Sequence, residues 1–521
     1  MTKRQALAAV LGLALALTGC DDGFLETIPP DQVSDVNFWG QPKDAEMATN
    51  VVYRGLLGQN LLYLDGGTDN AFVAKYFVGD GIQFIGNGTH TPTTGWISTI
   101  WNGHYTHISY ANELLERIDE IPSLEPALNA RYKAEARFLR AYYYTNLVNL
   151  YGDVPLVLKT LTIDEGKTVA RAPAKDVVDQ IMADLDYAAG ILPNSWPAAQ
   201  RGRATKGAAL ALKARAALYA GRYDVAATAA KAVMDMNVYS LYPNYTNLFY
   251  NVGEGNAEVI LDRQYIRDQA SNSVFQAFAP RSLLGTNDVS PLRSLVDEYE
   301  MKDGLRITQS PLYDANNPYA NRDPRFYGTI IHPGMTYAGR LFDSRPNSNT
   351  ADAAKSGFDA TATGFAMVKY VDPADQSSRT NTGLNIILLR YADVLLMYAE
   401  AKTELGQIDA SVYDAINRVR ARATMPPITT GKSQAQLRDI IRHERRIELA
   451  LEGLRMFDIR RWRIAEQVLT GPTFGMDYVE GGVKKVVEVE PRRFNAARDY
   501  LWPIPVRETE LNANIKQNPG Y

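Results

Sequence analysis

Cysteine is almost absent from this sequence: its 521 residues contain one, Cys20. A single cysteine excludes an intramolecular disulfide framework and any metal site built from a cysteine cluster. Histidine is also scarce, with five residues. His104 and His107 are spaced for one face of a metal site, but neither a third histidine nor an H-E-x-x-H pattern accompanies them. We therefore expect no metal centre and interpret both histidines as core or surface residues.

Long apolar runs and an excess of basic charge are missing as well. After residue 20, no apolar stretch is long enough to span a membrane as a helix. The formal net charge is −4, whereas a nucleic-acid-binding surface requires an excess of basic residues. The hydrophobic content of 46% is that of a globular chain, and 30 tyrosines stand out as an unusually high count. We expect a globular protein that binds no nucleic acid.

The first twenty residues carry an export signal. Lys3 and Arg4 precede an apolar run over residues 6–17, which is too short to span a membrane but suits a signal peptide. The run ends in Leu17-Thr18-Gly19-Cys20, the Leu-x-Gly-Cys pattern of a bacterial lipobox. We predict that residues 1–19 are a signal peptide, that Cys20 is lipidated, and that residues 20–41 form a lipid-anchored linker. The alternative is a free cysteine at the end of an ordinary signal peptide.

Helical spacing of apolar residues recurs along most of the chain. In the strongest case, Leu139 and Tyr143 lie on one face between residues 129 and 151, and Gly152 predicts the end of that helix. The other segments with this pattern are residues 44–57, 96–118, 174–192, 205–219, 223–236, 387–405, 413–423 and 434–453. Residues 217–226, with an echo at 398–419, resemble the helix–turn–helix of a tetratricopeptide repeat.

The fold class that we predict is mostly α, with tetratricopeptide-like helix pairs as a scaffold. Residues 237–385 differ from the rest, because they are rich in Asn, Gly, Pro and Tyr and contain short strand-like pieces at 258–262, 326–331 and 365–371. Long irregular stretches in compact proteins are usually functional. We expect one domain over residues 42–521: a helical part to about 236, this loop-rich, short-strand region for ligand binding, and a helical part from about 386.

Several segments, in this order and behind a lipobox, resemble the SusD/RagB family of Bacteroidetes outer-membrane lipoproteins. They are Ala134-Glu-Ala-Arg-Phe-Leu-Arg-Ala-Tyr-Tyr-Tyr144, Leu150-Tyr-Gly-Asp-Val-Pro-Leu156, Leu389-Arg-Tyr-Ala-Asp-Val-Leu-Leu396, Glu444-Arg-Arg-Ile-Glu448, Arg455-Met-Phe-Asp-Ile-Arg-Arg-Trp462, Trp502-Pro-Ile-Pro505 and Gln517-Asn-Pro-Gly-Tyr521. The resemblance implies a binding protein rather than an enzyme, without a cofactor. It also implies a lid over a SusC-like TonB-dependent transporter, on the outer face of the outer membrane. Asp21 and Asp22 look like the acidic signal that directs such lipoproteins to the surface.

A glycan site needs an exposed ring that stacks on a sugar, with polar side chains around it for the hydroxyls. The loop over residues 79–96 offers Asp80, Gln83, Asn87 and Trp96. In starch-binding members a Trp-bearing loop ahead of the next helix contributes to the sugar site, so the resemblance implies that role for Trp96. From the irregular middle we expect contributions among Tyr265, Tyr313, Tyr319 and Tyr337, with Arg267, Asn287, Arg322 and Phe342 as further candidates.

Two other groups of polar residues have structural and functional interpretations. Asp65, Asp69 and Asn70 could supply oxygens to a structural calcium ion, although their spacing is not that of an EF-hand. The charged residues of the family motifs, such as Arg390, Glu448 and others, could form a catalytic carboxylate pair with an arginine clamp. We favour partly buried ion pairs that stabilise the scaffold.

Four functions remain open at this point. The leading hypothesis is a surface lipoprotein that binds oligosaccharides or polysaccharide and delivers them to a SusC-like transporter. A peptide-binding lipoprotein of the RagB type is the first alternative. A secreted glycoside hydrolase is the second, although no recognisable constellation among the 59 acidic residues supports it. A purely structural tetratricopeptide adaptor would leave the Tyr- and Asn-rich middle without a ligand.

Overall fold

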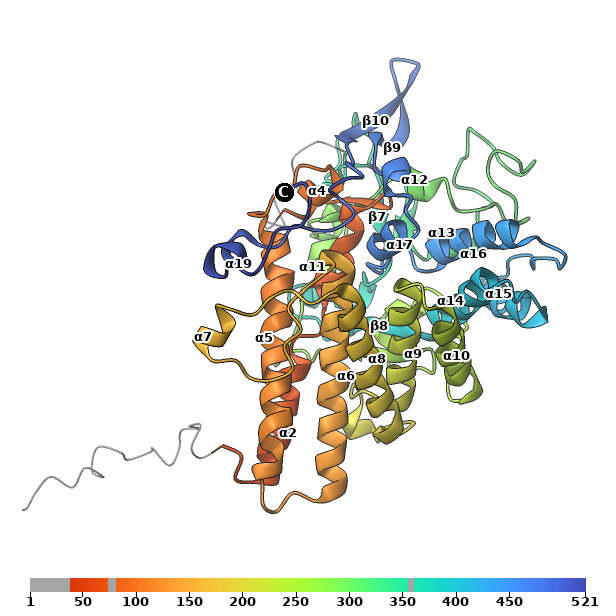
Figure 1. The fold of residues 1–521 in the computed structure, drawn as a ribbon. Helices are drawn as coiled ribbons and strands as arrows, with labels where there is room; N and C mark the ends of the chain where they lie inside the picture. The colour runs from red at the N-terminus through yellow and green to blue at the C-terminus, as the bar shows by residue number, and fades with distance from the viewer. Residues whose placement is uncertain (1–37, 74–80, 355–359) are drawn as a thin grey trace, which may run out of the picture.

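The computed structural model describes residues 38–73, 81–354 and 360–521, and Figure 1 shows a mostly helical molecule. Cys20 and Asp80 lie outside the described residues. None of the helices in the described ranges combines the length and hydropathy that a membrane span requires.

Three helices form one side of the molecule. Helix α2 spans Pro42–Tyr53 and packs on α5 (Gly95–Arg117) and α6 (Pro126–Tyr151), the two long helices that run side by side in Figure 1. Helix α6 is buried over nearly its whole second half, as its wide apolar circumference predicts. It ends at Gly152, whose φ of 75° favours glycine.

The tetratricopeptide-like pairs continue from α6 as one stack. Helix α8 (Ala174–Ile191) packs on α6 and α9 (Lys206–Tyr219), and α10 (Tyr223–Asp235) packs on α9 and then on α14 (Tyr391–Glu404). Helices α15 (Ala410–Arg422) and α16 (Gln434–Glu448) follow on α14. The sequence predicts pairs scattered along the chain. The structure stacks them in space, because α10 and α14 lie side by side although the loop-rich middle separates them in sequence.

The strands are short and form two-stranded antiparallel pairs. Strand β2 (Val259–Arg263) pairs with β8 (Ile386–Arg390), so the segment that we predicted to be helical from residue 387 begins as a strand and becomes helix only at Tyr391. A buried apolar run does not distinguish the two by periodicity. The remaining pairs in the middle are β1 (Ala71–Val73) with β3 (Val289–Pro291), β4 (Ile330–Ile331) with β7 (Ala366–Met367), and β5 (Thr336–Tyr337) with β6 (Arg340–Leu341).

The longest strands were not predicted. Strands β9 (Gly471–Glu480) and β10 (Val483–Arg492) form a hairpin in the C-terminal part, which we expected to be helical. Gly481 and Gly482 make its two-residue turn, and both have positive φ. The hairpin lies at the same end of the molecule as α4 (Ile82–Gly86) and α12 (Arg293–Val296) in Figure 1. Other short helices include α3 (Gln59–Tyr63), η2 (Leu64–Gly67), α7 (Ile163–Gly166), α11 (Val274–Phe278), α13 (Pro324–Tyr327), α17 (Arg455–Arg461), α18 (Ala465–Val468) and α19 (Val506–Leu511).

Buried ion pairs join the second half of the scaffold. Arg390 at the end of β8 donates to Glu448 and Glu452 at 2.6 and 2.7 Å, and all three side chains are buried. Arg445 of α16 bonds to Asp393 of α14 and, at 2.8 Å, to Asp458 of α17. The interpretation of the motif charges as buried ion pairs is therefore confirmed.

Candidate functional site

The polar loop residues before α5 take different positions. Gln83 is buried in α4, and its Oε1 has no hydrogen-bond partner among the described residues. Asn87, just after α4, is half-buried; its Oδ1 accepts from the amide of Thr89, and its Nδ2 donates to Glu490 of β10 at 3.3 Å. Asn87 therefore joins α4 to the hairpin, whereas Gln83 points away from solvent.

Trp96 does not present the exposed ring that we expected. It lies in the first turn of α5, its side chain is 2% exposed, and its ring packs edge-on against Tyr63 with 5.9 Å between centroids. The expectation of a solvent-facing stacking platform at this position is wrong, because packing against α3 buries the ring. Sequence alone does not distinguish a loop tryptophan from one on the inner face of a helix.

The four predicted tyrosines of the middle are not gathered in one place. Tyr337 is buried, and its hydroxyl bonds to Tyr250 and to the carbonyl of Val371, as in a packed core. Tyr265 is half-buried beneath the guanidinium group of Arg263, 5.3 Å from the ring centroid. Tyr313, also half-buried, lies in an irregular segment.

Tyr319 is the predicted tyrosine with a link to the hairpin end of the molecule. Its half-buried ring stacks on His332, with 4.5 Å between centroids. Burial and the negative charges of Asp477 and Asp297 raise the pKa of its hydroxyl. Because Asp477 lies on β9 and Asp297 ends α12, Tyr319 lies close to both elements.

A pocket of about 420 Å³ lies between α12 and β9, and we call it the α12–β9 pocket. The residues that line it are Asp69, Arg293, Ser294, Asp297, Val468, Thr470, Gly471, Pro472, Thr473, Phe474 and Arg492. Its size is in the range of small-ligand sites. Its polar lining comes from three regions far apart in sequence, which explains why no local motif indicates it.

Arg293 is bonded to two carboxylates at this pocket. Nε of Arg293 donates to Asp297 at 3.2 Å, and Nη1 donates to Asp477 at 2.6 Å. Burial raises the pKa of Asp297, although Arg293 partly offsets this effect. A guanidinium group between two partly exposed carboxylates offers both donors and acceptors, which is the arrangement that takes neighbouring sugar hydroxyls in pairs.

Phe474 adds an aromatic ring to the same pocket. Its side chain is half-buried and lines the cavity from β9, next to the hydroxyl of Thr473. A half-exposed ring beside an arginine–carboxylate pair combines the apolar face and polar edge that a sugar needs. Our sequence analysis missed Phe474 and Arg293. The signal for the hairpin was present, because Gly481-Gly482 separates two strand-like runs.

The base of the pocket is a fixed charge cluster. Asp69 accepts from both Nε and Nη2 of Arg455 at 2.9 Å and pairs with Arg446, and Arg492 donates to the carbonyl of Ala71 at 2.9 Å. Asp65 accepts from Asn70. The oxygens that we considered for calcium are thus engaged by protein donors, and no group of three or more potential metal ligands occurs in the described ranges. The calcium hypothesis has no support from these contacts.

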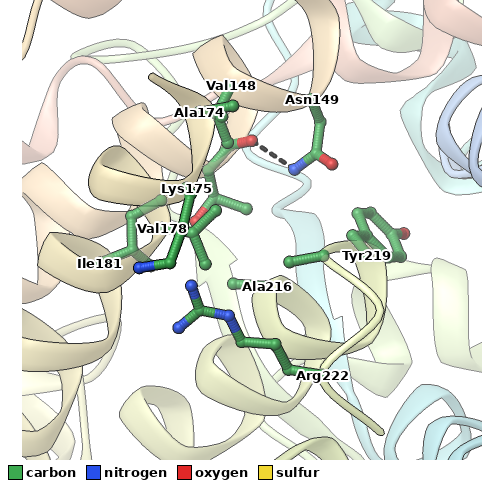
Figure 2. Close-up of a pocket in the computed structure, with 11 residues that line it drawn as sticks. Val148, Asn149, Ala174, Lys175, Val178, Ile181, Ala216, Tyr219 and Arg222 are labelled. Atoms are coloured by element: carbon green, nitrogen blue, oxygen red, sulfur yellow. Dashed lines mark hydrogen bonds between the residues drawn. The ribbon is translucent and has the colours of Figure 1, made fainter. Parts of the chain in front are cut away.

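A second concave surface lies on the helix pairs. This pocket has a volume of about 510 Å³ and lies between α6, α8 and α9. Figure 2 shows Asn149 and Tyr219 on one side of it, Lys175 on the other and Ala216 between them. Its lining is largely aliphatic, and its cations pair with one carboxylate: Lys175 and Arg222 both contact Asp179. An adjoining pocket of about 550 Å³ shares Val148, Asn149, Ala174 and Tyr219 with it.

Comparison with known proteins gives one consistent result. The family described as the SusD family matches residues 256–521, and a family described as "Starch-binding associating with outer membrane" matches residues 36–218. A SusD-like carbohydrate-binding protein of Bacteroides fragilis has a similar structure, with a TM-score of 0.86 and 32% identity over 92% of this chain and 100% of that chain. A laminarin-binding SusD-like protein gives a TM-score of 0.72 with 26% identity over the same shares. SusD-like protein P2 of Formosa agariphila is 28% identical over 98% of each chain.

Proposed function

The chain belongs to the SusD family, and from this premise we propose that it is a cell-surface lipoprotein that binds oligosaccharides or polysaccharide and delivers them to a SusC-like TonB-dependent transporter. The observation that carries the proposal is the α12–β9 pocket. There a half-exposed ring, Phe474, lies with an arginine, Arg293, that is bonded to two carboxylates.

This combination suits a neutral sugar better than other small ligands. A sugar ring has an apolar face that stacks on an aromatic side chain and an edge of hydroxyls that both donate and accept hydrogen bonds. Arg293 donates and the carboxylate of Asp297 accepts, whereas the hydroxyl of Thr473 is already bonded to the backbone of Glu490. Two structural relatives, one described as carbohydrate-binding and the other as laminarin-binding, support the same ligand class.

The anchor and the transporter belong to the proposal on different grounds. The anchor rests on the lipobox that ends at Cys20. The transporter rests on the family resemblance, in which the lipoprotein covers a barrel. Co-purification of the chain with a SusC-like transporter from the same organism would test the pairing directly, and its failure in mild detergent would remove the lid role while leaving glycan binding intact.

Two alternatives compete for the same surface. A peptide importer would use the pocket for side chains rather than sugars, and a glycoside hydrolase would use the carboxylates of Asp297 and Asp477 for catalysis. The decisive experiment is isothermal titration of the chain from residue 21 onward with a panel of polysaccharides and mixed peptides. In parallel, reducing ends are assayed. We expect binding of at least one glycan without release of reducing ends. Binding of peptides alone favours the importer, and released reducing ends favour the hydrolase.

A further inference from the structure

A cationic pocket lies where the ends of α6 and α9 meet α17 and the last residues of the chain. We call it the arginine pocket; its volume is about 550 Å³. It is lined by Val148, Asn149, Gly152, Asp153, Arg171, Ala174, Tyr219, Phe457, Arg460, Arg461, Arg463, Tyr500, Leu501, Asn518 and Pro519. The arginine pocket and the α12–β9 pocket have no lining residue in common within the described ranges.

Arg460 is the unusual member of this lining. Its side chain is buried, with 6% exposure, yet it has no carboxylate within ion-pair distance among the described residues. Its Nη1 donates to the carbonyl of Met456 in its own helix at 3.2 Å, and its Nε has no hydrogen-bond partner in the described part of the chain. A buried guanidinium group without a counter-ion is costly, and an anion in the pocket would supply the missing partner.

Two further arginines face the pocket without a carboxylate partner in the described ranges. Arg463 is exposed, and its guanidinium group lies over the ring of Tyr500, with 3.4 Å between its carbon and the ring centroid. Arg171 uses its donors on the carbonyls of Asp153 and Lys516 and on Oδ1 of Asn518. These contacts fix the direction of both side chains but leave their charges uncompensated.

The acidic groups near the pocket do not balance these charges. Asp153 lines it and accepts from the amide of Ala174 at 2.7 Å. Arg461 is compensated separately, because it donates to Glu400 at 2.5 Å and to Asp458 at 2.9 Å. The buried Asp499 is bonded to Arg498 at 2.6 Å and acts on Arg460 only from beyond ion-pair distance. Arg171, Arg460 and Arg463 therefore face a single lining carboxylate, Asp153, in a chain whose net charge is negative.

We propose that the arginine pocket is a second binding site, which holds the oxyanionic group of an acidic sugar, either the carboxylate of a uronic acid or a sulfate ester. Both groups are anions with several acceptor oxygens, in a planar arrangement in the carboxylate and a tetrahedral one in the sulfate ester. Arginine binds either group with parallel hydrogen bonds. The sugar part of this inference rests on the proposed function, whereas the anion part rests only on the three arginines.

The remaining lining favours a sugar as the carrier of the anion. Tyr219 is half-exposed at the boundary with the pocket of Figure 2, and Asn149 beside it uses Nδ2 on the carbonyl of Thr145, 2.6 Å away. The Oδ1 of Asn149 can accept from a ring hydroxyl while the anionic group reaches Arg460. The hydroxyl of Tyr219 is engaged elsewhere, because it accepts from the buried Arg445 at 3.4 Å, so Tyr219 contributes only its ring to the pocket wall. The volume is in the small-ligand range.

The test uses the chain from residue 21 onward, titrated calorimetrically at low ionic strength. The titrants are glucuronate and galacturonate oligomers, galactose 6-sulfate, galactose as the neutral match, inorganic sulfate and an acidic peptide. We expect one of the acidic sugars to bind more tightly than galactose, and this acidic-sugar binding to weaken with added salt. Arg460→Gln and Arg463→Gln should each weaken acidic-sugar binding about tenfold or more, the change expected for a lost charge-assisted hydrogen bond.

Arg345→Gln provides the matched control, because Arg345 is an exposed arginine whose carboxylate partner is Asp343. It should leave acidic-sugar binding unchanged, and thermal unfolding should show that Arg463→Gln is folded. Uronate binding or sulfate-ester binding that depends on Arg460 and Arg463 supports the site and identifies its anion. Binding of inorganic sulfate alone, of the acidic peptide alone, or of acidic sugars with unchanged affinity in both variants overturns it. If the neutral polysaccharides of the panel described under the proposed function fail to bind while acidic sugars bind here, the neutral-sugar proposal for the α12–β9 pocket fails and this one stands.

Discussion

Nη1 of Arg293 lies 2.6 Å from Oδ1 of Asp477, so one ion pair joins α12 to β9, the two walls of the α12–β9 pocket. Arg293 is 35% exposed and Asp477 is 25% exposed. An ion pair that faces solvent to this extent contributes at most about 1 kcal/mol to stability. We infer that its main effect is to hold the guanidinium group and two carboxylates in place for a ligand.

Replacing Arg293 therefore separates binding from stability. Arg293→Gln should weaken glycan binding by about 1.5–3 kcal/mol, because it removes a charged donor, and should change the free energy of unfolding by less than about 1 kcal/mol. Calorimetric titration and urea unfolding of the same preparation measure the two quantities. The control is Arg345→Gln, which removes an arginine of a surface pair elsewhere. Unfolding of Arg293→Gln under native conditions would show that the residue is structural.

Trp96 should behave as a core residue. Trp96→Ala removes a ring that is 2% exposed, and we expect the free energy of unfolding to fall by about 3–5 kcal/mol. Trp96→Phe keeps most of the volume and should cost less. Urea unfolding measures both, and glycan titration of the folded protein should show unchanged affinity. A Trp96→Ala protein with normal stability and no glycan binding would show that the Trp96 ring is part of the ligand site.

The buried charge network makes the scaffold sensitive to loss of one partner. Glu448 accepts from Arg390 at 2.6 Å, pairs with Arg422 and lies 3.1 Å from Arg325. Glu448→Gln leaves these guanidinium groups partly uncompensated, so we expect a loss of about 3–5 kcal/mol in the free energy of unfolding. Glu404→Gln, at the less buried pair with Arg438, should cost far less. Similar losses of unfolding free energy in Glu448→Gln and Glu404→Gln would contradict a special role of the buried network.

The same network predicts loss of stability in acid. Burial by itself raises the pKa of Glu448, but Arg422, Arg390 and Arg325 together lower that pKa well below its usual value. A carboxylate with a depressed folded-state pKa stabilises the fold above its unfolded pKa of about 4.3, and this contribution is lost as the pH falls below that value. Asp65 changes stability with pH in the opposite sense to Glu448, since burial raises the pKa of Asp65 to about 6. Urea midpoints should therefore fall steeply below about pH 4.3, and less steeply in Glu448→Gln.

The predicted lipid anchor can be tested at Cys20, the one cysteine that could carry the lipid. Cys20→Ser should abolish labelling by radioactive palmitate and move the protein from the membrane to the soluble fraction, because no other cysteine exists in the chain. Thr18→Ser keeps the Leu-x-Gly-Cys pattern and should remain anchored. Membrane retention and labelling of Cys20→Ser would show that the lipobox interpretation is wrong.

Much of the scaffold could be predicted from sequence, because its signals are local. The apolar circumference of α6 and the stop at Gly152 follow from the spacing of residues within one helix. The buried pairs around Arg445 were predictable as a group, since charged residues three and four apart on apolar helices need partners. These inferences require no knowledge of how distant segments meet.

The candidate site could not be predicted in the same way. Arg293, Asp69 and Phe474 come from three distant segments, and only the tertiary fold brings them to one pocket. Trp96 resembles a loop tryptophan in sequence and is buried by Tyr63 and its neighbours. The hairpin that carries Phe474 was the avoidable error, because the Gly481-Gly482 turn signal was present.

The most direct test of glycan recognition at the α12–β9 pocket is a calorimetric comparison of Phe474→Ala with Val479→Ala, on the same strand β9 but exposed. Both are titrated with a polysaccharide that binds the unmodified chain. We expect Phe474→Ala to lose about 1–3 kcal/mol of binding free energy, the range for truncating an aromatic anchor, and Val479→Ala to bind normally. Equal affinity of the unmodified chain and a folded Phe474→Ala protein would contradict glycan recognition at this pocket.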